Sequence, residues 1–83
     1  MNMQHGIIME RVESSQIEAI GHDVITDTLA IQFKGKTGPG SIYHYRNVDY
    51  QAFEQFKSAE SIGSYFYKNI KPFPEKFPYQ KMP

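Results

Sequence analysis

The sequence contains no cysteine among its 83 residues. This absence excludes a disulfide framework, a thiolate metal site and a cysteine nucleophile. The chain also lacks a net charge, because nine basic side chains balance nine acidic ones, and it is therefore unlike the strongly basic proteins that often bind nucleic acids. No apolar run approaches the roughly 20 residues that span a bilayer, and the start has neither the basic nor the apolar region of a signal peptide. We therefore expect a soluble, cytoplasmic protein without a membrane partner.

The composition is that of an ordinary folded chain. Hydrophobic residues make up 40% and charged residues 22%, which argues against intrinsic disorder. A chain of this length forms one small domain. Because disulfides are excluded, we expect the aromatic residues to supply much of the core.

The zero net charge hides an asymmetry along the chain. Up to Phe33, five carboxylates face one arginine, which gives a net charge of −4; after it, eight basic residues face four acidic ones, which gives +4. All twelve Phe and Tyr residues lie at or after Phe33. Basic and aromatic side chains therefore interleave in the second part, either as core rings with solvated lysines or as a surface that binds phosphates and stacks on bases.

Three strands are predicted. Residues 28–34 alternate apolar and polar side chains, the period-two pattern of a half-buried strand. Residues 17–24 break this alternation, and a bulge near Gly21 would restore it. The glycine-rich segment 35–40 predicts a long hairpin loop, which is followed by a third strand over 41–46.

A short helix is predicted from the spacing of Tyr50, Phe53 and Phe56, which form one apolar stripe. Asn47 or Val48 is the expected N-cap, with an acidic residue following in the first turn.

A second helix is predicted from Ile62 to Ile70, with Ser61 as its N-cap. Gly63 in its first turn suggests a close packing contact that excludes a side chain there. The prolines that follow forbid further helix and predict an extended tail.

This order predicts an α+β domain over residues 12–82: a three-stranded antiparallel β-meander, then two short helices covering one face, then an extended tail rich in proline and aromatic residues. Residues 1–11 are expected to form an N-terminal tail that pairs with an edge strand.

No catalytic pattern is found. Gly35-Lys36-Thr37 lacks the earlier glycine and the following helix of a phosphate-binding P-loop, although its amides and lysines remain able to touch phosphate. The three histidines have no metal-binding spacing, and His44 is interpreted as a surface strand residue that could contact a base. We therefore expect no enzymatic activity, no metal and no cofactor.

Several segments follow one another in an order that points to a known family. They are Val12-Glu13-Ser14-Ser15 with residues 17–23, then 29–33, Tyr43-His44-Tyr45, 61–66 and 77–82. Over residues 12–82 the chain resembles the KTSC domain, a family found alone in bacterial and phage proteins and at the C-terminus of some lysyl-tRNA synthetases. The family's function is not established, and its synthetase context implies RNA binding.

The residues and the resemblance together predict a non-enzymatic module that binds RNA or single-stranded nucleic acid. Basic side chains would meet phosphates, and exposed rings would stack on bases. The candidate binding residues are Lys34, Lys36, Tyr43, His44, Tyr45, Arg46, Lys68, Lys71 and Lys81.

Two other interpretations remain open. The acidic and basic parts of separate copies could pair in a homo-oligomer, which could enclose a nucleotide or another small anion near the Gly-Lys loop. Alternatively, Tyr43 and Tyr45 are core residues under the helices, and binding then falls to His44 and Arg46.

Overall fold

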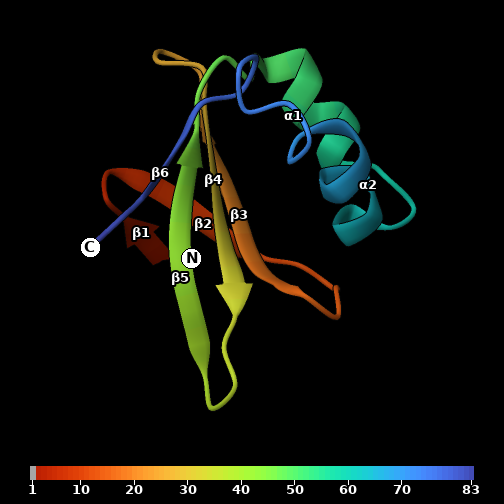
Figure 1. Cartoon of the computed structure of the whole chain (residues 1–83). Helices are drawn as coiled ribbons and strands as arrows, with labels where there is room; N and C mark the ends of the chain where they lie inside the picture. The colour runs from red at the N-terminus through yellow and green to blue at the C-terminus, as the bar shows by residue number, and fades with distance from the viewer. Residues whose placement is uncertain (1) are drawn as a thin grey trace.

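Alternating apolar side chains along three central strands build an antiparallel sheet, and two helices pack on one of its faces (Figure 1). The computed structural model describes residues 2–83, with side chains described from His5 onward. The elements are β1 (Asn2–Gln4), β2 (Ile7–Arg11), β3 (Ile17–Asp23), β4 (Thr28–Lys34), β5 (Pro39–Tyr45), α1 (Tyr50–Lys57), α2 (Ile62–Asn69) and β6 (Tyr79–Lys81).

The sheet follows the chain order β1-β2-β3-β4-β5-β6, and every neighbouring pair is antiparallel. The predicted three-stranded meander is confirmed as β3, β4 and β5, and the α+β class is confirmed with its two helices. The strand number was too low. The N-terminal segment adds the β1–β2 hairpin on one side, and the proline-rich tail adds β6 on the free edge of β5.

The main core lies between the sheet and the helices. Leu29 and Ile31 of β4 are fully buried there, as their alternation predicts, and they pack with Phe56 and Phe66 from the two helices. The bulge in β3 occurs between Ile17 and Ala19 rather than at Gly21. It lets residues 17 and 20 both face this core despite their odd spacing.

The helix caps follow the sequence with one correction. Ser61 caps α2, because its hydroxyl accepts from the amide of Ser64. The cap of α1 is Asp49 rather than Asn47 or Val48, because the Asp49 carboxylate accepts from the amide of Ala52.

The other face of the sheet is covered by the β1–β2 hairpin, which crosses it on the side away from the helices (Figure 1). Ile7 and Met9 of β2 pack there on Ala19 and Ala30. The small residues of β3 and β4 on this face therefore leave room for a second, thin apolar layer.

Gly63 has a different environment from the one its position suggested. A Cβ atom at Gly63 would lie 3.4 Å from Gln16 Oε1 and 3.5 Å from Ser14 Oγ, which are ordinary contacts. The expected exclusion of a side chain at this position is therefore wrong.

Candidate functional site

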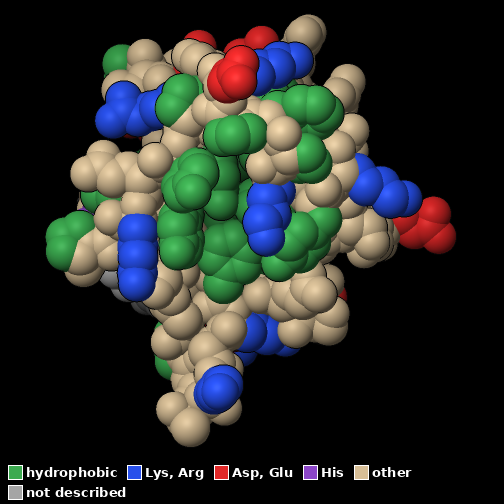
Figure 2. Space-filling view, viewed as in Figure 1, with side chains coloured by type: hydrophobic (Ala, Val, Ile, Leu, Met, Phe, Trp, Pro, Cys, Tyr) green, Lys and Arg blue, Asp and Glu red, His purple; other side chains and the backbone are tan. Residues whose placement is uncertain are grey.

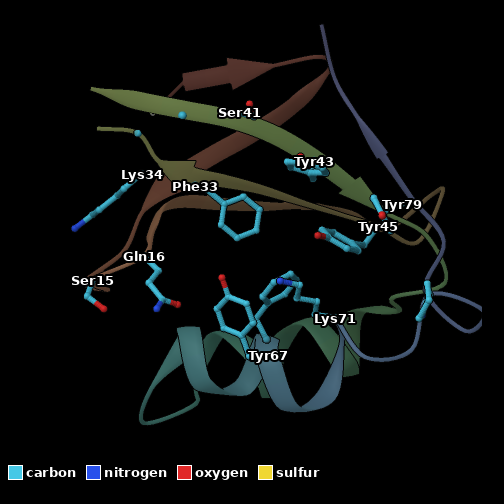
Figure 3. Close-up of a pocket in the computed structure, with 14 residues that line it drawn as sticks. Ser15, Gln16, Phe33, Lys34, Ser41, Tyr43, Tyr45, Tyr67, Lys71 and Tyr79 are labelled. Atoms are coloured by element: carbon cyan, nitrogen blue, oxygen red, sulfur yellow. The ribbon is translucent and has the colours of Figure 1, made fainter. Parts of the chain in front are cut away.

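An aromatic groove of about 830 Å³ opens between the helix-facing side of the sheet and α2 (Figure 3). In the space-filling view, hydrophobic side chains gather over this face, and a Lys or Arg side chain stands among them (Figure 2). The groove is lined by Ser15, Gln16, Phe33, Lys34, Gly35, Gly40, Ser41, Tyr43, Tyr45, Phe66, Tyr67, Lys71, Pro74 and Tyr79.

Four rings from three strands form the sheet wall of the groove. Tyr43 and Tyr45 lie two residues apart in β5 and therefore share one face, with ring centroids 6.4 Å apart. Tyr79 of β6 pairs in register with Tyr45, and their centroids are 5.6 Å apart. The ring of Phe33 in β4 packs edge to face against that of Tyr43, with the two centroids 5.6 Å apart. The wall is thus a continuous aromatic surface.

The opposite side of the groove comes from α2. Phe66 is buried, and its ring centroid lies 5.4 Å from those of Phe33 and Tyr45. It therefore packs α2 against the sheet wall. Tyr67 is the next residue and points out of the helix's buried stripe, with 40% of its surface exposed. Its ring therefore faces the groove rather than the core.

Two lysines line the groove, and a third stands beside it at the edge of the sheet. Lys34 lies at the end of β4 and Lys71 just beyond α2, and both are exposed lining residues. Lys81 pairs in register with Tyr43, so it projects from the same face of the sheet at its edge. The groove consequently combines aromatic walls with positive charge.

The hydroxyl of Tyr45 is held in its neutral form. Burial, and then the neighbouring phenols of Tyr43, Tyr79 and Tyr67, raise the pKa of Tyr45 above its ordinary value. This hydroxyl can therefore take part in a hydrogen bond but does not act as a base near neutral pH.

Of the residues predicted from the sequence, the groove brings together Lys34, Tyr43, Tyr45 and Lys71. Tyr45 is itself a core residue with 6% of its surface exposed, and Tyr43 is half-buried, so their role as core rings holds as well. Four predicted residues have exposed side chains that do not line the groove: Lys36, Arg46, Lys68 and Lys81.

His44 lies elsewhere, and the expectation of a surface residue is wrong. Its side chain points to the opposite face of the sheet, and only 9% of the residue is exposed. The ring of His5, in the hairpin turn, packs there against the ring of His44, with their centroids 6.0 Å apart. Burial, with the nearby charges of His5 and Arg46, lowers the pKa of His44. Its Nε2 atom is buried and has no hydrogen-bond partner among the side chains described from His5 onward.

The aromatic lining residues Phe33, Phe66, Tyr67 and Tyr79 were not predicted as site residues. They come from three elements that the groove joins only after folding. The sequence did contain an indication that Tyr67 is a surface ring beside a lysine. It is one position away from the buried stripe of α2 and four residues before Lys71.

Within residues 2–83, no group of three or more His, Asp and Glu side chains is placed to hold a metal ion. Across the same residues, neither helix has the length and apolar character needed to cross a membrane.

Known proteins share this fold and much of this sequence. Residues 13–75 match the family described as the KTSC domain. A protein of Tsukamurella paurometabola is 39% identical over 64 residues, which cover 77% of this chain and 90% of that protein. The crystal structure of a KTSC domain protein from Yersinia pestis superposes with a TM-score of 0.77 at 35% identity, covering 93% of this chain and 99% of the other.

Proposed function

The chain belongs to the KTSC domain family, and we propose that it is a non-enzymatic module that binds RNA or single-stranded nucleic acid in the aromatic groove. The observation that carries the proposal is the placement of lysines beside a groove with aromatic walls. Single-stranded nucleic acids are bound in this way, by rings that stack on bases and by positive charges along the backbone.

The exposed rings suit stacking better than the buried ones. Tyr67 and Tyr79 have 40% and 58% of their surfaces exposed, so a base can reach their faces without disturbing the core. Tyr45 and Phe66 are buried and support these rings from beneath. We therefore assign the stacking to Tyr67 and Tyr79 and the phosphate contacts to Lys34 and Lys71.

Binding rather than catalysis fits the polar groups of the groove. They are lysines, phenols, an amide and two serine hydroxyls, and the buried phenol of Tyr45 stays protonated. These groups hold a ligand by stacking, hydrogen bonding and charge.

The proposal is tested by an NMR titration of labelled protein with a short mixed-sequence RNA at low and moderate salt. We expect salt-sensitive shifts that cluster on residues of the groove. In Tyr67→Ala, affinity should fall by the contribution of one stacked base, about 1 to 3 kcal/mol.

Tyr50→Ala is the matched control, because Tyr50 is similarly exposed at 55% but does not line the groove. It should bind as the unaltered protein does. A spectrum that stays unchanged with RNA at low salt would overturn the proposal.

Self-association is a second candidate function, supported by a different part of the surface. A small cleft of about 180 Å³ is bordered by the exposed side chains of Ile8, Val24 and Tyr50. Beside them, Lys57 Nζ lies 3.0 Å from Glu10 Oε1. Because this patch combines exposed apolar groups with charges of both signs, two copies could pair through it about a twofold axis.

Sedimentation velocity over a wide concentration range tests this candidate. Val24→Lys should weaken any dimer, because it places a second positive charge in the apolar border. A monomeric mass at every concentration would remove self-association from consideration.

A further inference from the structure

One of the two lysines that line the aromatic groove lies over an aromatic ring. Lys71 Nζ lies over the ring of Tyr67, 4.7 Å from its centroid. Figure 3 shows the Lys71 side chain directed back into the groove beside Tyr67 rather than out into solvent. The ammonium thus covers one of the exposed rings on which a base would stack.

The end of α2 sets this position. The backbone amides of Ile70 and Lys71 both donate to the carbonyl oxygen of Phe66, at 3.0 and 2.9 Å. These two bonds continue the winding of the chain past Asn69, the last residue of α2. Lys71, four residues after Tyr67, is thereby brought above the same side of the helix.

Two other lysines lie near rings, but neither ring belongs to the groove. Lys76 Nζ is 5.2 Å from the ring centroid of Phe77, and Lys57 Nζ is 6.0 Å from that of Phe53. Both of these rings are buried core residues. Among the described cation–ring contacts, the Lys71 contact is the one at a ligand-accessible face.

We propose that Lys71 is a specificity-determining gate that admits rings carrying phosphate and disfavours uncharged ones. This inference rests on the proposed function of the groove. A ring that stacks on Tyr67 must displace the ammonium and so breaks its contact with the aromatic face. A phosphate on the incoming ligand replaces that contact with a charge-assisted hydrogen bond, whereas an uncharged ligand does not.

The gate predicts opposite effects on charged and uncharged ligands when the ammonium is removed. Lys71→Met keeps a long flexible side chain but deletes the charge. We expect it to bind a phosphodiester oligouridylate more weakly than the unaltered protein does. It should bind the same oligomer with uncharged methylphosphonate linkages more tightly, by about two- to fivefold, the factor that an exposed cation–ring contact corresponds to.

Lys76→Met is the matched control, since it removes a lysine that lies over a ring outside the groove. It should bind both oligomers as the unaltered protein does. An NMR signature gives a second readout: ring currents of Tyr67 should shift the Lys71 Hε signals upfield in the free protein, and phosphodiester oligomer should abolish this shift.

The outcomes separate the gate from the proposed function. If the unaltered protein binds the phosphodiester oligomer but Lys71→Met fails to bind the uncharged oligomer more tightly, the gate is overturned and the binding function stands. If the unaltered protein does not bind the phosphodiester oligomer at all, both the function and the gate are overturned.

Discussion

Gly21 of β3 lies directly beneath the carbonyl oxygen of Ile8 in β2. A Cβ atom at Gly21 would overlap that oxygen and would stand 2.8 Å from Ile7 Cγ2 and 3.0 Å from Met9 Sδ. Glycine is therefore required at this point by the close approach of the β1–β2 hairpin to the sheet, and not by a positive φ angle or by the β3 bulge.

Gly21→Ala should loosen the hairpin. The obstructing atom belongs to the backbone of β2, so the strand itself has to move to admit a methyl group. We expect the free energy of unfolding to fall by about 1 to 3 kcal/mol, the usual cost of overpacking. Urea unfolding followed by circular dichroism measures this loss.

Gly63→Ala is the control for the same chemical change. A methyl group there makes only ordinary contacts and replaces a glycine inside α2, so stability should be unchanged or higher by up to about 1 kcal/mol. Equal losses at the two glycines would contradict the packing argument.

The stability of the protein should fall as the pH is lowered through the ordinary pKa of histidine. Burial, with the charges of His5 and Arg46, lowers the pKa of His44 in the folded state from 6.5. Below pH 6.5 the unfolded chain therefore takes up a proton that the folded chain resists, and unfolding becomes more favourable. For one group, the free energy of unfolding changes by at most about 1.4 kcal/mol per pH unit. Below the pKa of His44 in the folded protein this dependence disappears, because the group is then protonated in both states.

Urea unfolding between about pH 5 and pH 8 measures this dependence, and NMR titration of the His44 ring measures its pKa. His44→Leu should flatten the profile in this range. A His44 pKa at or above 6.5 in the folded protein would refute the prediction.

The N-cap of α1 gives a third prediction. The Asp49 carboxylate accepts from the Ala52 amide at 2.9 Å, and Phe53 and Phe56 of the same helix are buried in the core. Asp49→Ala should lower the free energy of unfolding by about 0.5 to 2 kcal/mol. Gln51→Ala, an exposed change in the first turn of the same helix, should have little effect in the same urea experiment.

The central strands and both helices could be predicted because their side chains report burial directly. The alternation in β4 marks the core face, and Ser61 marks the start of α2 by the hydrogen bond its hydroxyl makes. The bulge was predicted in the correct strand, although its position near Ile17 depends on register with Phe33, which the sequence of β3 alone does not contain.

The outer strands could not be predicted in the same way. β6 has three residues, all exposed, and its place depends on backbone pairing with β5 rather than on a side-chain pattern. His44 was misplaced for a related reason. Alternation puts it on the face opposite Tyr43 and Tyr45, but only the fold of the β1–β2 hairpin determines that this face is covered.

The salt dependence of nucleic-acid binding provides the last prediction. Each phosphate neutralised on a single strand contributes a slope of about −0.7 to the plot of log affinity against log salt concentration. If Lys34 contacts one phosphate at the end of β4, Lys34→Gln should make this slope shallower by about 0.7. Fluorescence anisotropy of a labelled oligonucleotide, recorded over a series of salt concentrations, measures the slope.

Lys76→Gln removes the same charge outside the groove and should leave the slope unchanged, because Lys76 does not line the aromatic groove. The comparison distinguishes a contact in the groove from general attraction by the basic part of the chain, since net charge alone would make the two variants equal. A slope that becomes shallower in Lys36→Gln but not in Lys34→Gln would place the phosphate at the tip of the β4–β5 loop instead, outside the groove.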